Sequence, residues 1–306
     1  MRPVPIVAVV GATASGKSDL ALALASALGG EVVNTDAMQV YRGMDIGTAK
    51  LPVGERRGIP HHLLDLLEVS EPATVAEFQG WAREVIADCR ARAVVPVLVG
   101  GSALYTRAIL DVFEFPGTDP ALRAQLDDQL TEVGPAALHA RLAAVDPEAA
   151  AAIIPSNGRR IVRALEVVTM TGRPFVATLP GQVYADPDTV QIGVDIDRET
   201  LDRRIAERVD AMWAAGFVEE VRRLAAVGLR DGLTANRALG YRQVLAFLDG
   251  DLSEDEAREQ TISGTRRFAR RQDSWFRKDP RIAWVGHDDP ARVAEAAAAV
   301  EAIRRP

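Results

Sequence analysis

The sequence predicts an α/β fold, with a parallel sheet flanked by helices and an all-helical subdomain inserted into the chain. Residues 6–10 (IVAVV) form a continuous apolar, β-branched run, which is typical of a strand buried on both faces. A glycine-rich loop and an Ala/Leu-rich helical stretch follow directly. Strand and helix patterns alternate toward both ends of the chain, whereas the middle has only helical patterns, which indicates an inserted subdomain.

The first part of the chain follows a strand–helix alternation. After the strand at 6–10 we expect a helix at 18–28 and a strand at 31–35 that ends at Asp36. Many glycines and prolines between residues 38 and 67 predict a long loop region. The next expected elements are a helix at 77–93, a strand at 94–99 and a helix at 102–110.

The pattern changes near residues 115–118 (FPGT) and remains helical to about 178, after which Pro180-Gly181 and Asp186-Pro187 end it. A strand at 191–196 then returns to the core. Helices are expected at 198–224, 237–248, 253–277 and 290–304, with a last strand at 282–285. We therefore predict a core formed by residues 1–116 and 189–306, with the insertion at 117–188.

The composition is that of a globular protein in a reducing compartment. Of the 306 residues, 48% are hydrophobic and 26% charged, and no apolar run reaches the roughly 18 residues of a membrane span. The N-terminus lacks the apolar segment of a signal peptide, and the single cysteine, Cys89, excludes an internal disulfide. We expect a cytoplasmic protein without a membrane partner. The net charge of −7 resides in the first 150 residues, and the basic clusters farther on leave RNA binding open.

The loop after the first strand matches G-x-x-x-x-G-K-[ST], the P-loop motif found in many ATP-binding proteins. In such a loop the backbone N–H groups and the helix N-terminus favour an anion. Lysine adds a point charge, and the hydroxyl of the last residue is placed for Mg²⁺. The sequence thus predicts a P-loop NTPase-like sheet with a polyphosphate site at Gly11, Ala12, Thr13, Ala14, Ser15, Gly16, Lys17 and Ser18, the last as magnesium ligand.

An acidic residue is also expected near this loop. NTP-hydrolysing P-loop proteins usually carry a magnesium-binding Asp at the end of a second strand, but the strand at 94–99 ends in Gly100-Gly101. Asp36 follows the strand at 31–35, so it should lie at the carboxyl edge of the sheet near the P-loop. The alternative is that Asp36 caps a helix.

Residues 34–50 (NTDAMQVYRGMDIGTAK) closely resemble the tRNA dimethylallyltransferases, also called isopentenyl-transferases. Further segments match this family in order, at 58–63, 100–105, 157–166, 238–242 and 265–277, so the resemblance covers nearly the whole chain. It implies that the P-loop binds the diphosphate of dimethylallyl diphosphate. The acceptor would be the exocyclic amine of the adenosine immediately 3′ of the anticodon.

The resemblance also implies roles for individual residues. Asp36 matches the general base that takes a proton from the weakly nucleophilic amine. Thr13 matches a threonine beside that acid. Arg271 matches the catalytic arginine, which with the P-loop would stabilise the leaving diphosphate. The reacting base has to leave its stack.

Further matched positions imply contacts with the anticodon stem-loop of the tRNA. We expect the protein to be a monomer. The family more often has Thr at the position of Ser102, which keeps a hydroxyl. The implied contacts are Asp36, Ala37, Met38, Gln39, Ser102, Arg123, Arg159, Arg160 and Arg163.

Basic residues gather at the end of the helix expected at 253–277. Arg266, Arg267, Arg270 and Arg271, extended by Arg277 and Lys278, form one stripe on a helix. The stripe could follow a phosphate backbone or be a solvated face with salt bridges. Of the four tryptophans, we expect core or partly exposed structural positions for all except Trp275, which lies within the stripe. For His61-His62 a structural role is expected, because no third metal ligand is evident nearby.

Two other functions fit parts of this pattern. A small-molecule P-loop kinase would explain the P-loop and Asp36, but not residues 36–50 or the arginine clusters. A non-catalytic RNA-binding protein would leave the P-loop unexplained.

Overall fold

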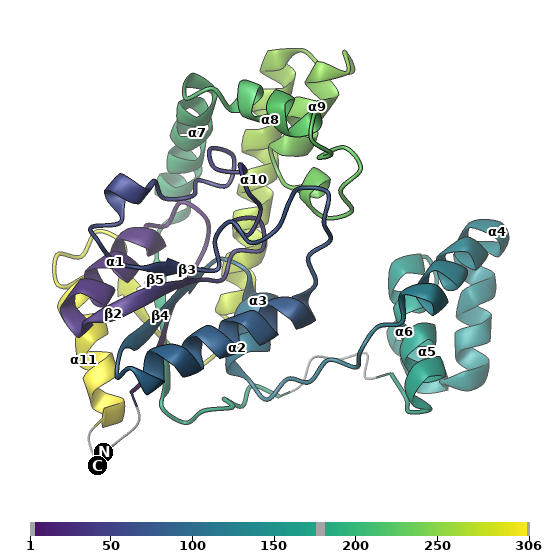
Figure 1. Cartoon of the computed structure of the whole chain (residues 1–306), viewed down its shortest axis with the longest axis horizontal. Coiled ribbons are helices and arrows are strands. Elements are labelled where there is room, and N and C mark those ends of the chain that lie inside the picture. Colours follow the sequence, from purple (N-terminus) through teal and green to yellow (C-terminus); the bar gives the residue numbers. More distant parts are fainter. Residues whose placement is uncertain (1–3, 176–180, 305–306) are drawn as a thin grey trace. The chain divides into compact units, whose positions relative to one another are not determined.

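The computed structural model describes residues 4–175 and 181–304 (Figure 1). The chain forms two compact units. One combines Met1–Asp111 with Tyr184–Pro306, and the other is Val112–Val183. The larger unit holds the sheet, so its elements position the P-loop and Asp36.

The sheet has six strands: β1 (Ile6–Val10), β2 (Gly30–Asn34), β3 (His61–His62), β4 (Val95–Gly100), β5 (Thr189–Asp195) and β6 (Ile282–Gly286). Their order is β3-β2-β4-β1-β5-β6, and all neighbours are parallel. The predicted α/β fold with a parallel sheet is confirmed. Only β3 was not predicted, because two residues are too few for a periodic pattern.

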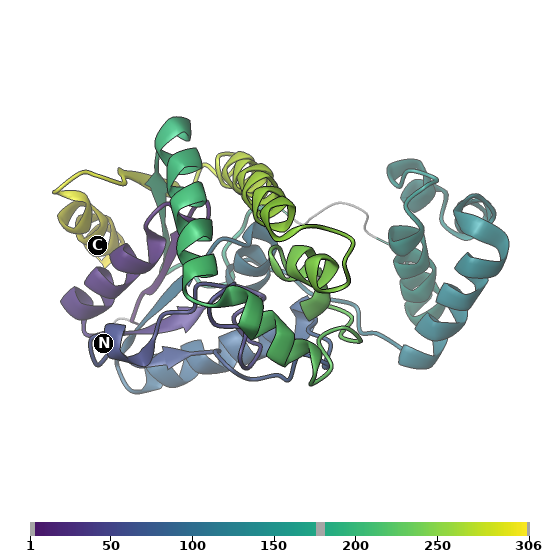
Figure 2. The ribbon, with the colours of Figure 1, turned by 90° about the horizontal axis from the view of Figure 1, so that it is seen from above.

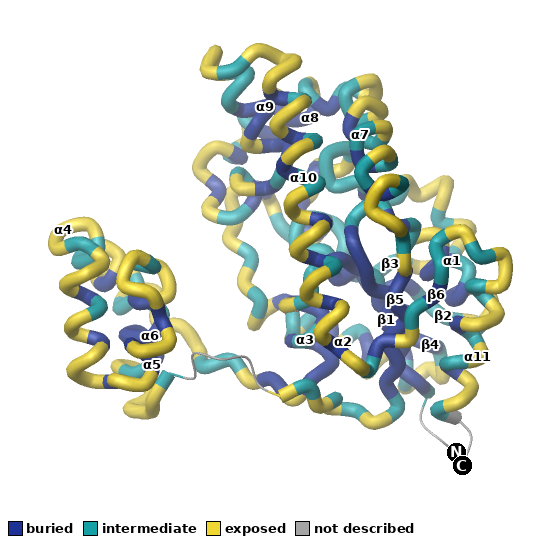
Figure 3. The backbone as a smooth tube through the Cα atoms, turned by 180° about the vertical axis from the view of Figure 1, so that it is seen from behind, coloured by how far each residue is buried: buried dark blue, intermediate teal, exposed yellow. Residues whose placement is uncertain are grey.

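Helices cover both faces of the sheet, which is why β1 is apolar and buried along its whole length. One face packs against α1 (Lys17–Leu28) and α11 (Arg292–Arg304), and the other against α2 (Val75–Ala91) and α3 (Ala103–Leu110). Figure 3 shows the central strands in the buried colour. A capping box between Thr74 and Glu77 begins α2.

The carboxyl edge of the sheet carries a further layer of helices: α7 (Arg198–Ala214), α8 (Phe217–Ala225), α9 (Tyr241–Leu248) and α10 (Glu254–Phe276). The helix α10 packs against α7 and α9 (Figure 2). The loops hold the short 3₁₀ helices η1 (Val53–Glu55) and η2 (Ala235–Arg237). The prediction of one helix over 198–224 is wrong, because Gly216 adopts φ 90° and separates α7 from α8.

The unit Val112–Val183 contains α4 (Pro120–Val145), α5 (Pro147–Ala152) and α6 (Gly158–Thr171), and its described residues form no strand. The backbone of α4 leaves the helical region at Gly134, before Pro135, and its two halves pack with α6 around Leu126, Leu142 and Ile161. Residues 176–180, the end of the segment expected to be helical, lie outside the described residues.

The sequence predicted no membrane-spanning segment and no internal disulfide. Across residues 4–175 and 181–304, no helix combines the length and the apolar character needed to cross a bilayer. Cys89 is a buried free thiol.

Candidate functional site

The P-loop connects β1 to α1, as predicted. Gly16 precedes α1 with φ 97°, and the first turn of a helix has N–H groups without partners in the helix. At Gly11, where φ is 140°, an added Cβ would lie 3.2 Å from the Val194 carbonyl oxygen of β5. Gly16 thus permits a left-handed backbone conformation that other residues rarely adopt. Gly11 permits the loop to pass close to β5.

Lys17 lies at the start of α1 and its Nζ donates to the Ala12 carbonyl at 2.6 Å. Burial lowers the pKa of Lys17 to about 8, and the positive charge of Arg208 adds to this, whereas Asp36 acts in the opposite direction. The charges of Arg208 and Asp36 therefore both influence the protonation of Lys17. A bound anion close to Lys17 would favour its protonated form.

Asp36 lies two residues beyond the end of β2. Its backbone N–H donates to Asn34 Oδ1 at 2.8 Å, and its Oδ1 accepts the Met38 N–H at 2.9 Å. Residues 37–40 form turns, so the alternative that Asp36 caps a helix is wrong. The hydrogen bonds fix the carboxylate at the wall of a cavity, where a substrate proton could reach it.

That cavity has a volume of about 660 Å³ and is lined by all three residues predicted for catalysis. Thr13 and Asp36 line it together with Ala37, Met38 and Ser102, and α10 contributes Arg271. The backbone N–H of Thr13 donates to Gln272 Oε1 at 2.9 Å. The sequence thus predicted residues that the fold brings into one hollow from four separate segments.

A second cavity of about 410 Å³ is lined by other residues of the P-loop. Lys17 and Ser18 line it, together with the arginines Arg204, Arg208 and Arg292. Ala14, Ala49 and Arg208 line both cavities, so the two hollows adjoin at the P-loop. Gln39, another predicted contact, lines the second cavity, and its Nε2 donates to the Thr48 carbonyl at 3.1 Å.

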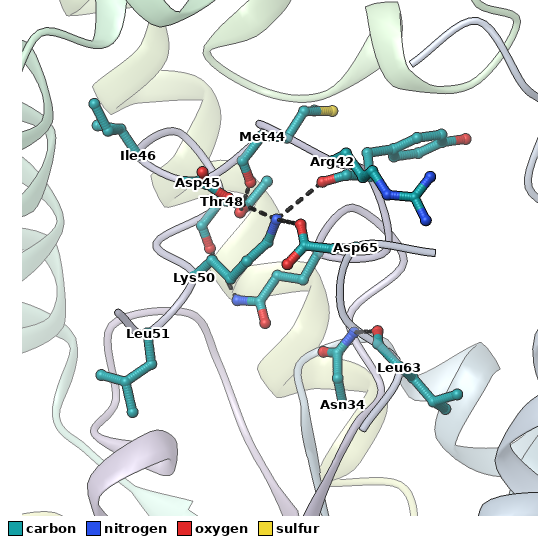
Figure 4. Close-up of polar contacts among 12 residues, drawn as sticks. Asn34, Arg42, Met44, Asp45, Ile46, Thr48, Lys50, Leu51, Leu63 and Asp65 are labelled. Carbon is teal, nitrogen blue, oxygen red and sulfur yellow. Dashed lines mark hydrogen bonds and ion pairs between the residues drawn. The ribbon is translucent and has the colours of Figure 1, made fainter. Parts of the chain in front are cut away.

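The loop after Asp36 is held by Lys50, a side chain with only 3% exposure. Its Nζ donates to the Tyr41 carbonyl at 2.9 Å, to Asp45 Oδ1 at 2.7 Å and to Asp65 Oδ1 at 2.6 Å (Figure 4). All three N–H donors of the ammonium are thus used within the protein. We conclude that Lys50 organises the loop rather than facing a ligand.

Glu220 of α8 anchors the same loop from the other side. Its carboxylate accepts the backbone N–H groups of Asp45, Ile46 and Gly47 at 2.7–3.2 Å and the Tyr241 hydroxyl at 2.6 Å. At Gly47 a Cβ would lie 2.2 Å from the Phe217 ring, so a glycine is required there. These contacts fix the backbone of the loop and leave no room for a side chain at Gly47.

The predicted arginine stripe of α10 divides between two environments. Arg266 and Arg270 bond to Asp202 of α7, with Arg270 Nη2 3.1 Å from its Oδ2. Arg267 and Arg271 line the larger cavity. Arg277 pairs with Asp273 and Asp195 and stacks on the Trp284 ring at 3.9 Å. The alternative of a face with salt bridges therefore holds for part of the stripe, whereas Arg267 and Arg271 stay available to a ligand in the cavity.

In the unit Val112–Val183, the four predicted arginine contacts also differ in environment. Arg159 and Arg160 are exposed in the first turn of α6. Arg123 and Arg163 bond to Glu166, whose side chain is fully buried, at 2.8 and 2.7 Å. Arg163 also donates to the carbonyls of Pro116 and Gly117.

Glu166 depends on these partners. Burial alone would raise its pKa, but hydrogen bonds from Thr118, Arg163 and Arg123 outweigh burial and hold the pKa below its usual value. Glu166 is therefore a charged anchor within this unit.

Three polar residues near the cavities were not predicted from the sequence: Arg208, Gln272 and Glu220. The burial of Arg208 lowers its pKa, and Asp36 opposes that shift. One signal for Arg208 was available, because Arg204 and Arg208 are four residues apart on the helix that follows a predicted strand. Gln272 and Glu220 gave no signal, since their partners are far away in the sequence.

His62 has more neighbours than the sequence suggested. Its Nε2 lies 2.7 Å from Glu31 Oε2, and the thiol of Cys89 lies 3.6 Å from the same oxygen. The expectation that no further metal-ligating groups lie near His62 was thus wrong. Both oxygens of Glu31 nevertheless accept from the Arg92 guanidinium, at 2.8 and 2.7 Å. This ion pair supports the structural role expected for His62.

Comparison with known proteins identifies the family. The family model described as IPP transferase matches residues 39–279. A tRNA dimethylallyltransferase of Nocardioides sp. is 71% identical over 298 residues, which cover 97% of this chain and 96% of the relative. A tRNA dimethylallyltransferase of Salinispora arenicola is 62% identical over 304 residues, which cover 98% of this chain and 87% of the relative.

Solved structures agree with this match. A tRNA isopentenylpyrophosphate transferase of Bacillus halodurans is 38% identical with a TM-score of 0.72, covering 98% of each chain. A eukaryotic dimethylallyltransferase, solved as it acts on tRNA, is 26% identical with a TM-score of 0.84, covering 99% of this chain and 80% of its own. The chain belongs to the IPP transferase family, which includes the tRNA dimethylallyltransferases.

Proposed function

We propose that this protein transfers the dimethylallyl group of dimethylallyl diphosphate to the exocyclic amine of the adenosine immediately 3′ of the anticodon in tRNA. Prenyl transfer to tRNA follows from the family. The observation that carries the finer assignment is the pair of adjoining cavities, one with Asp36 at its wall and one with Lys17 and Ser18. Donor and acceptor can thus approach the P-loop from separate hollows.

The reaction forms a bond between the adenine nitrogen and C1 of the prenyl group while the bond from C1 to the diphosphate oxygen breaks. Diphosphate leaves with the electron pair of that bond, and one amine proton passes to the Asp36 carboxylate. An adenine amine is a weak nucleophile because its lone pair is delocalised into the ring, so a positioned base lowers the barrier. Thr13 lines the same cavity and is proposed to help orient the acceptor.

The leaving diphosphate would bind the N-terminus of α1, where N–H groups and the helix dipole favour an anion. Lys17 and Arg208 add positive charge, and Arg271 contributes from α10. In this proposal the P-loop residues 11–18 bind a diphosphate and not a nucleoside triphosphate. Charge that develops on the leaving group in the transition state is thereby stabilised.

Magnesium fits the residues at the diphosphate site. Ser18 is an exposed hydroxyl in the first turn of α1 and lines the same cavity as Lys17. A hydroxyl oxygen together with diphosphate oxygens and water is the kind of ligand set that Mg²⁺ prefers. When bound, Mg²⁺ supplies further positive charge to the leaving group.

For tRNA we propose contacts at two places. Around the larger cavity, Asp36, Ala37, Met38 and Ser102 would hold the extruded base, with Gln39 nearby. In the unit Val112–Val183, Arg159 and Arg160 would contact the phosphate backbone, while Arg123 and Arg163 would contribute charge from positions fixed by Glu166. Because one chain supplies all these groups, we propose that it acts as a monomer. We also propose that it acts in the cytoplasm, as expected from its composition and its single cysteine.

The test is incubation of the purified protein with Mg²⁺, labelled dimethylallyl diphosphate and unmodified tRNA, followed by nucleoside analysis. Label in an isopentenyladenosine supports the proposal. Label at another nucleoside would refute the proposed acceptor, and consumption of ATP on a small metabolite without prenyl transfer would favour a kinase.

A further inference from the structure

Two exposed aromatic rings lie in a row on α10. Trp275 is 46% exposed and Phe268 is 38% exposed, and they are the only aromatic side chains among the exposed large hydrophobic residues of the described chain. By contrast Trp81, Trp213 and Trp284 pack against the main core. Single exposed aliphatic residues are common on protein surfaces, but two aligned aromatic rings require an explanation.

The spacing connects this row to the larger cavity. Phe268, Arg271 and Trp275 follow at i, i+3 and i+7, which places them on one side of the helix. Phe268 and Arg271 line the cavity that holds Asp36, and Trp275 lies one turn beyond Arg271, about 6 Å farther along the helix axis. The aromatic row therefore continues from the wall of the cavity to an exposed position on α10.

Positive charge accompanies both rings. The Arg271 guanidinium carbon lies 5.8 Å from the centre of the Phe268 ring, and Lys278 Nζ lies 6.0 Å from that of Trp275. The acids closest in sequence are engaged elsewhere, since Asp273 bonds to Arg277 at 3.2 Å and Asp279 to Arg281 at 2.7 Å. A cationic side chain thus lies beside each ring, although the chain carries a net charge of −7.

We propose that Trp275 is a stacking platform for an unpaired base of the tRNA anticodon loop, adjacent to the adenosine held in the cavity. This inference rests on the proposed function, because it takes tRNA as the ligand. A base presents a flat π-face to the indole, and its phosphates meet Arg267 and Lys278. Phe268, between Trp275 and the cavity, would border the path of the extruded nucleotide.

The experiment measures the affinity of an anticodon stem-loop RNA for the wild-type protein, Trp275→Leu and Trp275→Phe. Loss of one stacked base should raise Kd about 5- to 150-fold in Trp275→Leu, whereas Trp275→Phe keeps a ring and should retain most of the affinity. The dependence of Kd on salt should not change, because no charge is removed. Thermal unfolding of both variants serves as the control for folding. Wild-type affinity in Trp275→Leu would overturn the proposal.

A second arm identifies the base. Stem-loops with one abasic nucleotide at each loop position are bound to the wild type and to Trp275→Leu. At the position that stacks on Trp275, the abasic RNA should bind both proteins equally. If every abasic site costs the two proteins the same, no base stacks on Trp275 and the proposal is wrong. Prenyl transfer by the wild type to the intact stem-loop is measured separately, so its absence would count against the proposed function and not against the platform.

Discussion

Gln272 of α10 accepts the backbone N–H of Thr13 in the P-loop at 2.9 Å. Its Nε2 donates to the Gly101 carbonyl at 2.7 Å, and a Cβ at Gly101 would lie 2.3 Å from that nitrogen. The buried amide of Gln272 therefore links α10 to the P-loop after β1 and to the turn after β4. The position of Thr13 relative to Arg271 depends on this link.

We expect Gln272→Leu to lower turnover and stability together. The substitution leaves the Thr13 N–H and the Gly101 carbonyl without this partner, at a cost of about 1–3 kcal/mol for a buried group. Thermal unfolding and the kcat of prenyl transfer measure the two effects. Gln260→Leu, on an exposed position of the same helix, is the matched control. Normal kcat in a folded Gln272→Leu would show that the link does not position the site.

Asp36→Asn should separate binding from chemistry. An asparagine Oδ1 can still accept the Met38 N–H, so the turn after β2 is kept, but it cannot take a proton from the amine. Turnover should fall about 10²–10⁴-fold, with little change in tRNA affinity. Single-turnover rates and filter binding test this pair of outcomes. A rate close to that of the wild type would remove Asp36 from the role of base.

Lys17 gives the reaction a dependence on pH. Because the pKa of Lys17 is lowered to about 8, the ammonium loses its proton as the pH rises through that value. The KM for dimethylallyl diphosphate should therefore increase above about pH 8. Lys17→Gln should bind the donor weakly at every pH and lose this dependence. A wild-type KM that stays constant from pH 7 to pH 9 would contradict the assignment.

The same shift affects stability with the opposite sign. The unfolded chain keeps the lysine proton up to its ordinary pKa of 10.5, whereas the folded protein releases it near 8. Between these values the unfolded state binds more protons, so this group makes the protein more stable as the pH rises. Comparing denaturant midpoints of the wild type and Lys17→Gln over this range isolates the contribution.

Local sequence patterns were sufficient for the sheet and the P-loop. The run at 6–10, the glycine motif and the Ala/Leu-rich helix each depend on neighbouring residues, so β1 and α1 formed as expected. The break at Gly216 was missed, because a glycine inside a helical pattern is often tolerated. Of the site, Asp36 and the P-loop residues followed from motif and resemblance.

The remaining parts of the site depend on contacts between distant segments. Glu220 bonds to a loop more than 170 residues earlier, and Gln272 to Thr13 across 259 residues. No periodicity or motif encodes such a pair. The arginines of α10 show the same limit, since only the fold reveals that Arg270 faces Asp202 whereas Arg271 lines the cavity.

Arg208 lines both cavities, so Arg208→Ala should reduce kcat/KM for the donor. Removing one preorganised charged donor from a partly buried site costs about 10²–10³-fold. The charge of Arg208 also lowers the pKa of Lys17, so its removal should shift the rise in KM to a higher pH. Arg203→Ala, on the solvent side of α7 beside Glu207, is the control. Equal effects of the two variants would exclude a specific role for Arg208.

Arg160 and Arg163 lie one turn apart on α6 but should respond differently to substitution. Arg160 is exposed, so Arg160→Ala should weaken tRNA binding and reduce the slope of log K against log salt by about 1. Titrations of tRNA at several salt concentrations test this. A wild-type slope would remove Arg160 from the contact set.

Arg163→Ala should instead destabilise the unit Val112–Val183. Glu166 is fully buried and would lose one of its two guanidinium partners, and the carbonyls of Pro116 and Gly117 would lose their donor. The expected loss is about 1–3 kcal/mol. Because the pKa of Glu166 is held below its usual value, its contribution is present near neutral pH and disappears as the pH falls through that lowered pKa. The difference in the free energy of unfolding between the wild type and Arg163→Ala should therefore become smaller in acid. If this difference does not change with pH, the destabilisation does not come from the ion pair with Glu166.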